Sequence, residues 1–312
     1  MSISLRQLKY FVQVVELGNL TRAAEALHVA QPALSQQMAS LEDLLGLTLL
    51  VRGPRGVTPT AEGVLLHRHA QTILRQVDST PGLLRQAADH ITGTVSVGLA
   101  SSTARMLALP LIQQVKAELP AIVVEIVDVP SADLTKFVLQ GRVDFALSPD
   151  QQPLQGLTHE RLIREDLLLL THPDVRLRRR KPGIADIAGL PMILPSPPNT
   201  LRARVDHAFL TAGFATNLYA EASTSAILIP AVAAGLAATL LPYSAAHHEI
   251  DAGTIHAHTT AMGLTRELVL CASDAQPLTV AVSRVVDVCK REIRRLVQSG
   301  TWQGCALVSA GP

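Results

Sequence analysis

The chain has 312 residues, of which 48% are hydrophobic and 17% charged, a composition that excludes an intrinsically disordered chain and suits two or three domains. Its 27 Lys and Arg nearly balance its 26 Asp and Glu, and the 3% of aromatic residues argues against a stacking surface for single-stranded nucleic acid. Three cysteines give no disulfide framework and no signal peptide is recognised, so we expect a cytoplasmic protein without a membrane partner.

The first residues predict three helices. Thr21 is expected to cap the second helix, which runs to Leu27, and a turn over 28–30 leads into the third helix, which ends at Gly46. One face of the first helix carries the apolar residues Leu5, Leu8, Phe11, Val12 and Val15.

The third helix has an apolar face and a polar face. Its apolar residues recur at intervals of four, three and four, at Leu34, Met38, Leu41 and Leu45. Pro32 suits its first turn, where a missing N–H costs nothing. Small and amide side chains near a helix N-terminus reach base edges in a major groove, and Gln pairs with adenine. The predicted base-facing residues are Gln31, Pro32, Ser35 and Gln36.

A β-hairpin is predicted next, because short apolar runs at 47–51 and 57–59 flank a Gly/Pro turn. Arg55 lies at its tip, where it would enter a minor groove, and Arg52 and Thr21 would contact phosphates. Helices around a tight turn followed by such a hairpin form a winged helix-turn-helix, which reads double-stranded DNA. The alternative is a helix-turn-helix that binds only protein.

Thr60 is expected to cap a long linker helix with a heptad-like apolar seam, which predicts pairing with a second copy of the chain. In the alternative, the seam packs on the chain's own domain. Pro81 and Gly82 are expected to kink or restart this helix after Thr80. The predicted dimerisation residues are Leu66, Ala70, Ile73, Val77 and Leu84.

From Thr94 onward, predicted strands alternate with helices, a pattern typical of a mostly parallel α/β sheet. A helix is expected over 106–118 and a loose tail over 298–312. The uncharged stretch 222–246 is interrupted by Pro and Gly, so we expect a buried helix and strand rather than a membrane span.

The segment LRQLKYFVQVVELGNLTRAAEALHVAQPALSQQMASLEDLLGLTLLVRGPRGVTPTAEG resembles the N-terminal domain of the LysR-type transcriptional regulators. The resemblance implies an α/β protein with a winged helix-turn-helix (1–59), a linker helix (60–92) and a periplasmic-binding-protein-like effector domain (93–300). That domain would have two lobes, I (94–162 and 268–300) and II (163–267), before a tail (301–312).

Hydroxyl side chains follow several predicted strands, at the sheet edge where ligands bind in open α/β folds. They predict a site for a small polar or anionic effector, although Ser and Thr are also the usual helix caps. Arg105 and Arg202 are the only basic residues plainly near. The predicted effector residues are Ser101, Ser102, Thr103, Ser131, Ser196 and Thr224; Ser148 and Ser223 hold similar positions.

We therefore expect a regulator that binds promoter DNA as a dimer or tetramer, with RNA polymerase as a further candidate partner. The alternative is a small-molecule binding module whose helix-turn-helix serves assembly only. No enzyme, cofactor or metal is predicted, because no nucleophile–base pair is evident and His247, His248, His256 and His258 lack completing ligands. The basic run 178–181 is interpreted as a solvated loop, with a second DNA contact as the alternative.

Overall fold

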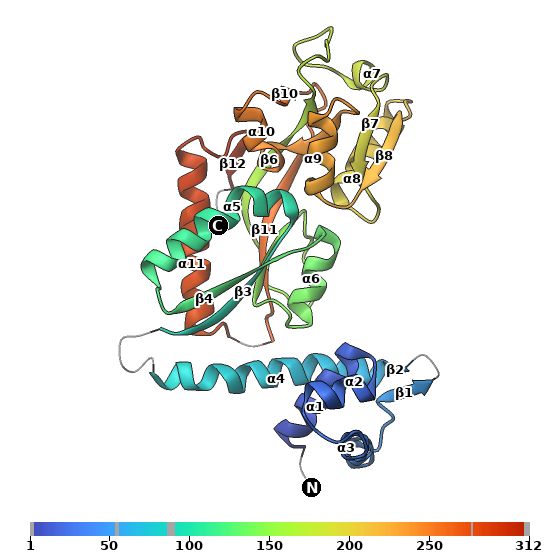
Figure 1. Cartoon of the computed structure of the whole chain (residues 1–312). Helices are drawn as coiled ribbons and strands as arrows, with labels where there is room; N and C mark the ends of the chain where they lie inside the picture. Colours follow the sequence, from blue (N-terminus) through green and yellow to red (C-terminus); the bar gives the residue numbers. More distant parts are fainter. Residues whose placement is uncertain (1–2, 54–55, 86–90, 276, 309–312) are drawn as a thin grey trace. The chain divides into compact units, whose positions relative to one another are not determined.

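A computed structural model describes residues 3–53, 56–85, 91–275 and 277–308 (Figure 1). The chain divides into two compact units, which we call the N-terminal unit (Met1–His90 with Gln140–Arg142) and the C-terminal unit (Ile91–Leu139 and Val143–Pro312).

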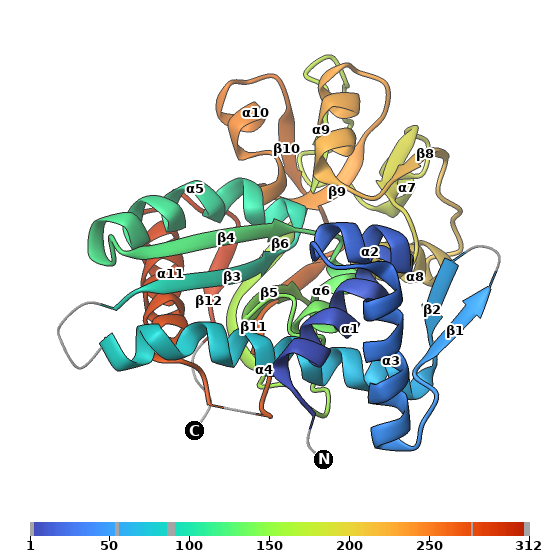
Figure 2. The same ribbon diagram turned by 60° about the horizontal axis from the view of Figure 1, so that its bottom comes forward.

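The N-terminal unit packs helices α1 (Leu5–Leu17), α2 (Leu20–Ala26) and α3 (Gln31–Leu45) around one apolar core (Figure 2). The stripe of α3 is confirmed, since Leu34, Met38 and Leu41 are buried. On α1 the buried row is shifted from the prediction: Val14 is fully buried, whereas Leu5 is 45% exposed.

The caps of these helices are only partly as predicted. Thr21 does not cap α2; Asn19 does, because its Oδ1 accepts hydrogen bonds from the backbone N–H of Thr21 at 2.9 Å and of Arg22 at 3.1 Å. Pro32 lies in the first turn of α3 and Gly46 ends that helix in the left-handed conformation, as expected.

Strands β1 (Leu50–Gly53) and β2 (Gly56–Pro59) form the predicted antiparallel hairpin. Glu42 fixes its base to α3, since its Oε1 accepts hydrogen bonds from Leu49 N at 2.7 Å and Leu50 N at 3.0 Å. Gly56 is required where the hairpin meets the end of α1, because its φ is +119° and a Cβ there would lie 2.3 Å from Gly18 O.

Helix α4 (Ala61–Arg85) is capped by Thr60, whose Oγ1 accepts a hydrogen bond from Gly63 N at 3.0 Å. No new helix begins after Thr80, so the predicted restart is wrong: α4 continues through Pro81, and the Thr80 hydroxyl donates to Gln76 O at 2.8 Å.

The C-terminal unit begins with a parallel βαβαβ series: β3 (Gly93–Leu99), α5 (Ser101–Glu118), β4 (Ile122–Asp128), α6 (Ser131–Leu139) and β5 (Phe145–Pro149). Helix α5 and the last helix, α11 (Val280–Gln298), cover one face of the sheet and α6 the other (Figure 1). Because α5 begins at Ser101 and not near residue 106, the predicted loop hydroxyls belong to its first turn.

Two long strands, β6 (Glu160–Thr171) and β11 (Thr265–Ala272), run from this lobe I into lobe II. The predicted lobe boundary falls inside β6, which pairs with β11 in its first part and with β9 (Thr239–Pro242) and β10 (His256–Thr259) further on. Lobe II also holds β7 (Met192–Pro195), β8 (Leu218–Ala222), α7 (Ile184–Ile187), α8 (Thr200–Thr211), α9 (Ser225–Ala233), the 3-10 turn η2 (Tyr243–Ala245) and α10 (His247–Asp251).

The C-terminal residues correct another expectation. Trp302 is 1% exposed, and β12 (Cys305–Leu307) pairs with β6, so this segment is packed rather than loose. The uncharged stretch forms α9 and β9, as predicted, and among the described residues no helix is long and apolar enough to cross a membrane.

Candidate functional site

The first turns of α3 present a polar, solvent-exposed face. Gln31, Pro32 and Gln36 are exposed, and Ser35 is half-buried. The N-cap residue, Ala30, provides no side-chain hydrogen bond, so the positive end of the helix dipole remains available to an anion. These residues lie together as the sequence predicted, and none between 31 and 39 is acidic.

Arg52 lies on β1, and its Nη1 donates a hydrogen bond to Ser35 Oγ at 3.0 Å. The contact joins the hairpin to the base-facing side of α3, a link that the sequence reasoning missed. Thr21 is exposed on α2, whereas Arg55 lies outside the described residues.

The seam of α4 is divided between two environments. Ala70 is fully buried and Leu66 packs against the core of the N-terminal unit, which corresponds to the alternative of packing on the chain's own domain. Ile73 and Val77 are 37% and 42% exposed. The side chain of Leu84 lies outside the described residues.

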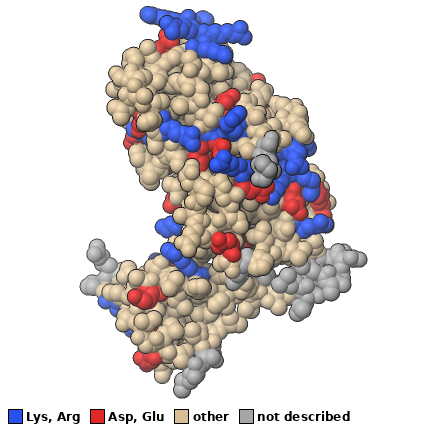
Figure 3. Space-filling view, turned by 180° about the vertical axis from the view of Figure 1, so that it is seen from behind, with Lys and Arg blue, Asp and Glu red and all other residues tan. Residues whose placement is uncertain are grey.

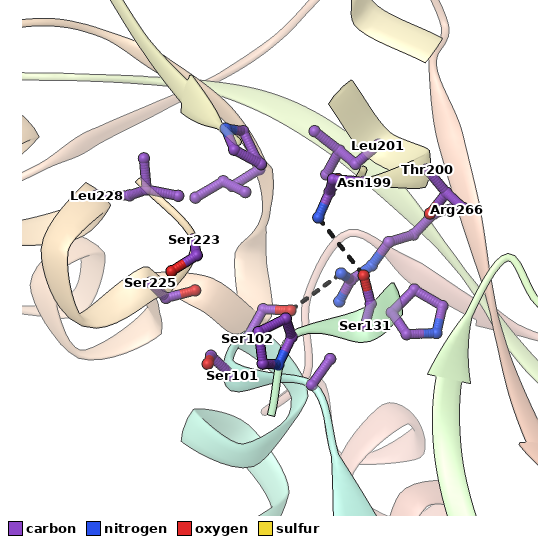
Figure 4. A pocket seen from close by; sticks show the side chains of 15 residues that line it. Ser101, Ser102, Ser131, Asn199, Thr200, Leu201, Ser223, Ser225, Leu228 and Arg266 are labelled. Carbon is purple, nitrogen blue, oxygen red and sulfur yellow. Dashed lines mark hydrogen bonds between the residues drawn. The ribbon is translucent and has the colours of Figure 1, made fainter. Parts of the chain in front are cut away.

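A cavity of about 50 Å³ lies where α5, α6, α8 and α9 begin, between the two lobes (Figure 4). Of the predicted effector residues, Ser101, Ser102 and Ser131 line it, as does Ser223. Thr103 and Ser148 are instead buried in the fold, and Ser196 and Thr224 are absent from the lining. The polar lining residues that sequence reasoning missed are Asn199, Thr200, Ser225 and Arg266.

Two helix N-termini without side-chain caps face this cavity. The N-caps of α5 and α9, Ala100 and Thr224, make no side-chain hydrogen bond, so first-turn N–H groups lack the usual capping acceptor. Ser225 is 5% exposed, lines the cavity and has no hydrogen-bond partner among the described side chains. Asn199 caps α8, and its Nδ2 donates to Ser131 Oγ at 3.5 Å across the two lobes.

Arg266 forms part of the cavity wall and belongs to a buried polar network. Its Nη1 donates to Ser102 Oγ at 2.9 Å, and its Nε donates to Glu165 Oε2 at 2.7 Å. Glu165 Oε1 accepts from Ser244 Oγ at 2.6 Å and from Trp302 Nε1 at 2.9 Å. The sequence gives no distinct signal for this pair, because Glu165 lies between Arg164 and Asp166 and Arg266 precedes Glu267. Only the register between β6 and β11 places the two opposite each other.

Two further ion pairs hold the lobes together. Arg105 of α5 donates to Glu249 of α10 at 2.6 Å, and Arg204 of α8 donates to Asp150, just after β5, at 2.8 Å. Burial raises the pKa of the Asp150 carboxyl, and its Oδ2 has no hydrogen-bond partner. The lobes are thus closed on a cavity far smaller than the roughly 300–1,000 Å³ of drug-sized ligand sites.

The described part of the chain contains no group of three or more His, Cys, Asp or Glu side chains that could hold a metal ion. Burial raises the pKa values of Cys271, Cys289 and Cys305 each to about 12, so these thiols stay protonated at neutral pH.

Family models match the sequences of both units. Residues 5–64 match the family model "Bacterial regulatory helix-turn-helix protein, lysR family", and residues 88–294 match "LysR substrate binding domain". The nitrogen assimilation regulatory protein nac of Klebsiella aerogenes is 39% identical over 249 residues, which cover 78% of this chain and 80% of that protein.

Solved structures show the same fold. A full-length OxyR variant from Pseudomonas aeruginosa aligns over 100% of both chains with a TM-score of 0.74 and 21% identity. Full-length CbnR in complex with its target DNA aligns over 93% of this chain and 100% of that one, with a TM-score of 0.67 and 22% identity.

Proposed function

This chain belongs to the LysR family of DNA-binding transcriptional regulators, and from that membership we propose how it reads DNA and what it senses. Helix α3 enters the major groove, with Gln31, Pro32, Ser35 and Gln36 facing base edges. Thr21 contacts a phosphate, and Arg55 reaches the adjacent minor groove.

The observation that carries this proposal is the exposed polar face of α3, braced by the hairpin through Arg52. The Arg52 guanidinium donates to Ser35 Oγ through Nη1, which leaves its other N–H groups for a phosphate. A base-reading side chain held in this way loses less conformational freedom when DNA binds.

We further propose that the protein acts as a dimer, or as a tetramer of two dimers, on a partly palindromic promoter site. Ile73 and Val77 lie one turn apart on α4 and are 37% and 42% exposed, which supports pairing with a second α4. The cytoplasm is the proposed location, with promoter DNA and RNA polymerase as partners.

The cavity is the proposed effector site, and a small anion is its proposed ligand. The N-termini of α5 and α9, which lack side-chain caps, favour negative charge there, and the unpaired hydroxyl of Ser225 can donate to an anion. The Arg266 guanidinium in the cavity wall is paired with Glu165. A volume of about 50 Å³ admits only a few atoms while the lobes are closed, so a larger effector requires them to open.

Selection of genomic DNA fragments by the purified protein, followed by mobility shifts on the enriched sites, tests this function. We expect Gln36→Ala to relax the preference at one base position by about 1–3 kcal/mol, because its side chain contacts a base edge. Gln13→Ala on α1, outside the base-facing surface, is the matched control and should leave the preference unchanged. Failure to enrich any sequence contradicts the proposal.

A further inference from the structure

A run of five cations projects from lobe II, in the connection between β6 and α7. We call residues 176–181 the basic loop; it contains Arg176, Arg178, Arg179, Arg180 and Lys181, and all five are exposed. Figure 3 shows them as a dense blue group at one end of the C-terminal unit, whereas blue and red groups alternate over much of the rest of the face in view.

The basic loop is poorly neutralised by its own chain. Arg179 Nε lies 3.9 Å from Asp186 Oδ2, an oxygen that already accepts a hydrogen bond from Gly183 N at 2.9 Å. In the described ranges, no carboxylate lies within ion-pair distance of the other four cations. Asp174, the nearest acid before the run, is exposed, and its Oδ2 lies 3.4 Å from His172 Nδ1.

Both ends of the basic loop are anchored to the lobe. Val175 N donates to His172 O at 3.0 Å before it, and Ala261 N donates to the carbonyl of the buried Pro182 at 3.0 Å after it. Leu177, within the run, packs against the apolar core. The cations are therefore presented from a fixed base, which lowers the entropy lost when they bind a partner.

Without the five cations of the basic loop, the net charge of the chain would be negative. Of the 27 Lys and Arg, five lie in the loop, so the other 22 are outnumbered by the 26 Asp and Glu. Residues 1–92, which include the helix-turn-helix, hold eight Lys and Arg against seven Asp and Glu. A DNA-binding protein gains much of its affinity from neutralised phosphates, and the N-terminal unit offers little net charge for that purpose.

We propose that the basic loop binds the phosphate backbone of DNA as a second contact, independent of sequence and separate from the base-reading face of α3. Residues 178–181 form a series of bends, so the five cations lie close together. Because duplex DNA carries one charge per about 1.7 Å of its axis, such a group can face several phosphates at once. The inference rests on the DNA-binding function, because it assigns a further part of the same bound DNA.

The test compares two double variants, one in the loop and one on α11, that each remove two exposed arginines. None of the four arginines forms an ion pair within the described residues. Arg178→Gln with Arg180→Gln neutralises the loop, and Arg284→Gln with Arg294→Gln is the charge-matched control. Anisotropy titrations use the full chain and a labelled duplex of about 60 base pairs, longer than two half-sites a few turns apart. Thermal unfolding confirms that both variants remain folded.

We expect the loop variant to lower the slope of log affinity against log salt by about 1.8 for each subunit whose loop contacts the DNA, from about 0.9 per lost phosphate contact. The control should keep the parent slope. Equal slopes for loop variant and parent, or an equal loss in the control, would overturn the inference. The inference would also be overturned if the loop variant no longer bound phosphatidylglycerol vesicles while its DNA salt slope stayed unchanged. That result would assign the loop to a membrane surface.

Gln36→Ala separates this inference from the proposed function. If Gln36→Ala changes base preference and the loop variant leaves the salt slope intact, only the loop contact is wrong. If the parent has no base preference on any enriched DNA, the proposed function itself fails.

Discussion

Replacing Arg266 with Met should strongly destabilise the C-terminal unit. Arg266 and Glu165 are 4% and 1% exposed, and the side chain of Met fills much of the same space without charge. The substitution leaves the Glu165 carboxylate buried, with only the neutral donors Ser244 Oγ and Trp302 Nε1. Breaking a buried ion pair from one side costs about 3–5 kcal/mol, so we expect a loss of that size in the free energy of unfolding.

The double variant Glu165→Gln with Arg266→Met should recover most of that loss. Its Gln keeps an oxygen that accepts the hydrogen bonds of Ser244 and Trp302, and no buried charge remains. We expect it to lie within about 1–2 kcal/mol of the parent, which makes the coupling energy between the two sites large.

Urea unfolding followed by the fluorescence of Trp302, the only Trp in the chain, measures these energies within the unit that contains the pair. Circular dichroism of the same samples checks that the transition is cooperative. A cost below about 1 kcal/mol for Arg266→Met would refute the reasoning, as would a double variant no more stable than the single one.

Three other changes test separate parts of the structure. Gly63→Ala should destabilise the N-terminal unit by about 1–3 kcal/mol or more in thermal unfolding, because the new Cβ would lie 2.1 Å from Leu49 O. Gly53→Ala is the control and should have little effect, because a Cβ at that position has no heavy atom within 4 Å. Ile73→Asp with Val77→Asp should give monomers in sedimentation analysis at micromolar concentration, and Leu154→Asp, on an exposed loop residue of the other unit, should leave the oligomer intact. Burial lowers the pKa of His247 in the folded protein, and repulsion from His248 and Arg105 lowers it further. As pH falls, the imidazole of residue 247 is therefore protonated in the unfolded chain before it is protonated in the folded one. Stability should fall as pH drops below about 6.5, the ordinary pKa of His. His247→Gln should reduce that fall in urea midpoints between pH 7.5 and pH 5.5, and an unchanged pH profile would show that His247 does not contribute.

The sequence predicted the local architecture well wherever one helix or hairpin carried its own signal. The spacing of Leu34, Met38 and Leu41 fixed the inward face of α3, and Gly46 marked its end. The N-cap of α2 was predicted at Thr21 alone, although Asn is also a common N-cap residue. The backbone conformation shows that Asn19 holds the position. Likewise, Ser101 looked like a loop residue although it begins α5.

The cavity was less predictable because it depends on contacts between distant segments. Of the hydroxyls predicted after strands, Ser101, Ser102 and Ser131 line the cavity, whereas Ser196 and Thr224 do not. Arg266 was missed because its partner Glu165 lies about 100 residues away and only the strand register brings them together. Trp302 joins the same network from a segment whose composition indicated a loose tail.

Base preference measured on DNA selected from genomic fragments tests the central claim most directly. The account predicts enriched sites with two related half-sites, and a preference at one position in each that Gln36→Ala relaxes and Gln13→Ala retains. Enrichment of DNA without any shared sequence, or a preference that Gln36→Ala leaves unaltered at every position, would contradict it.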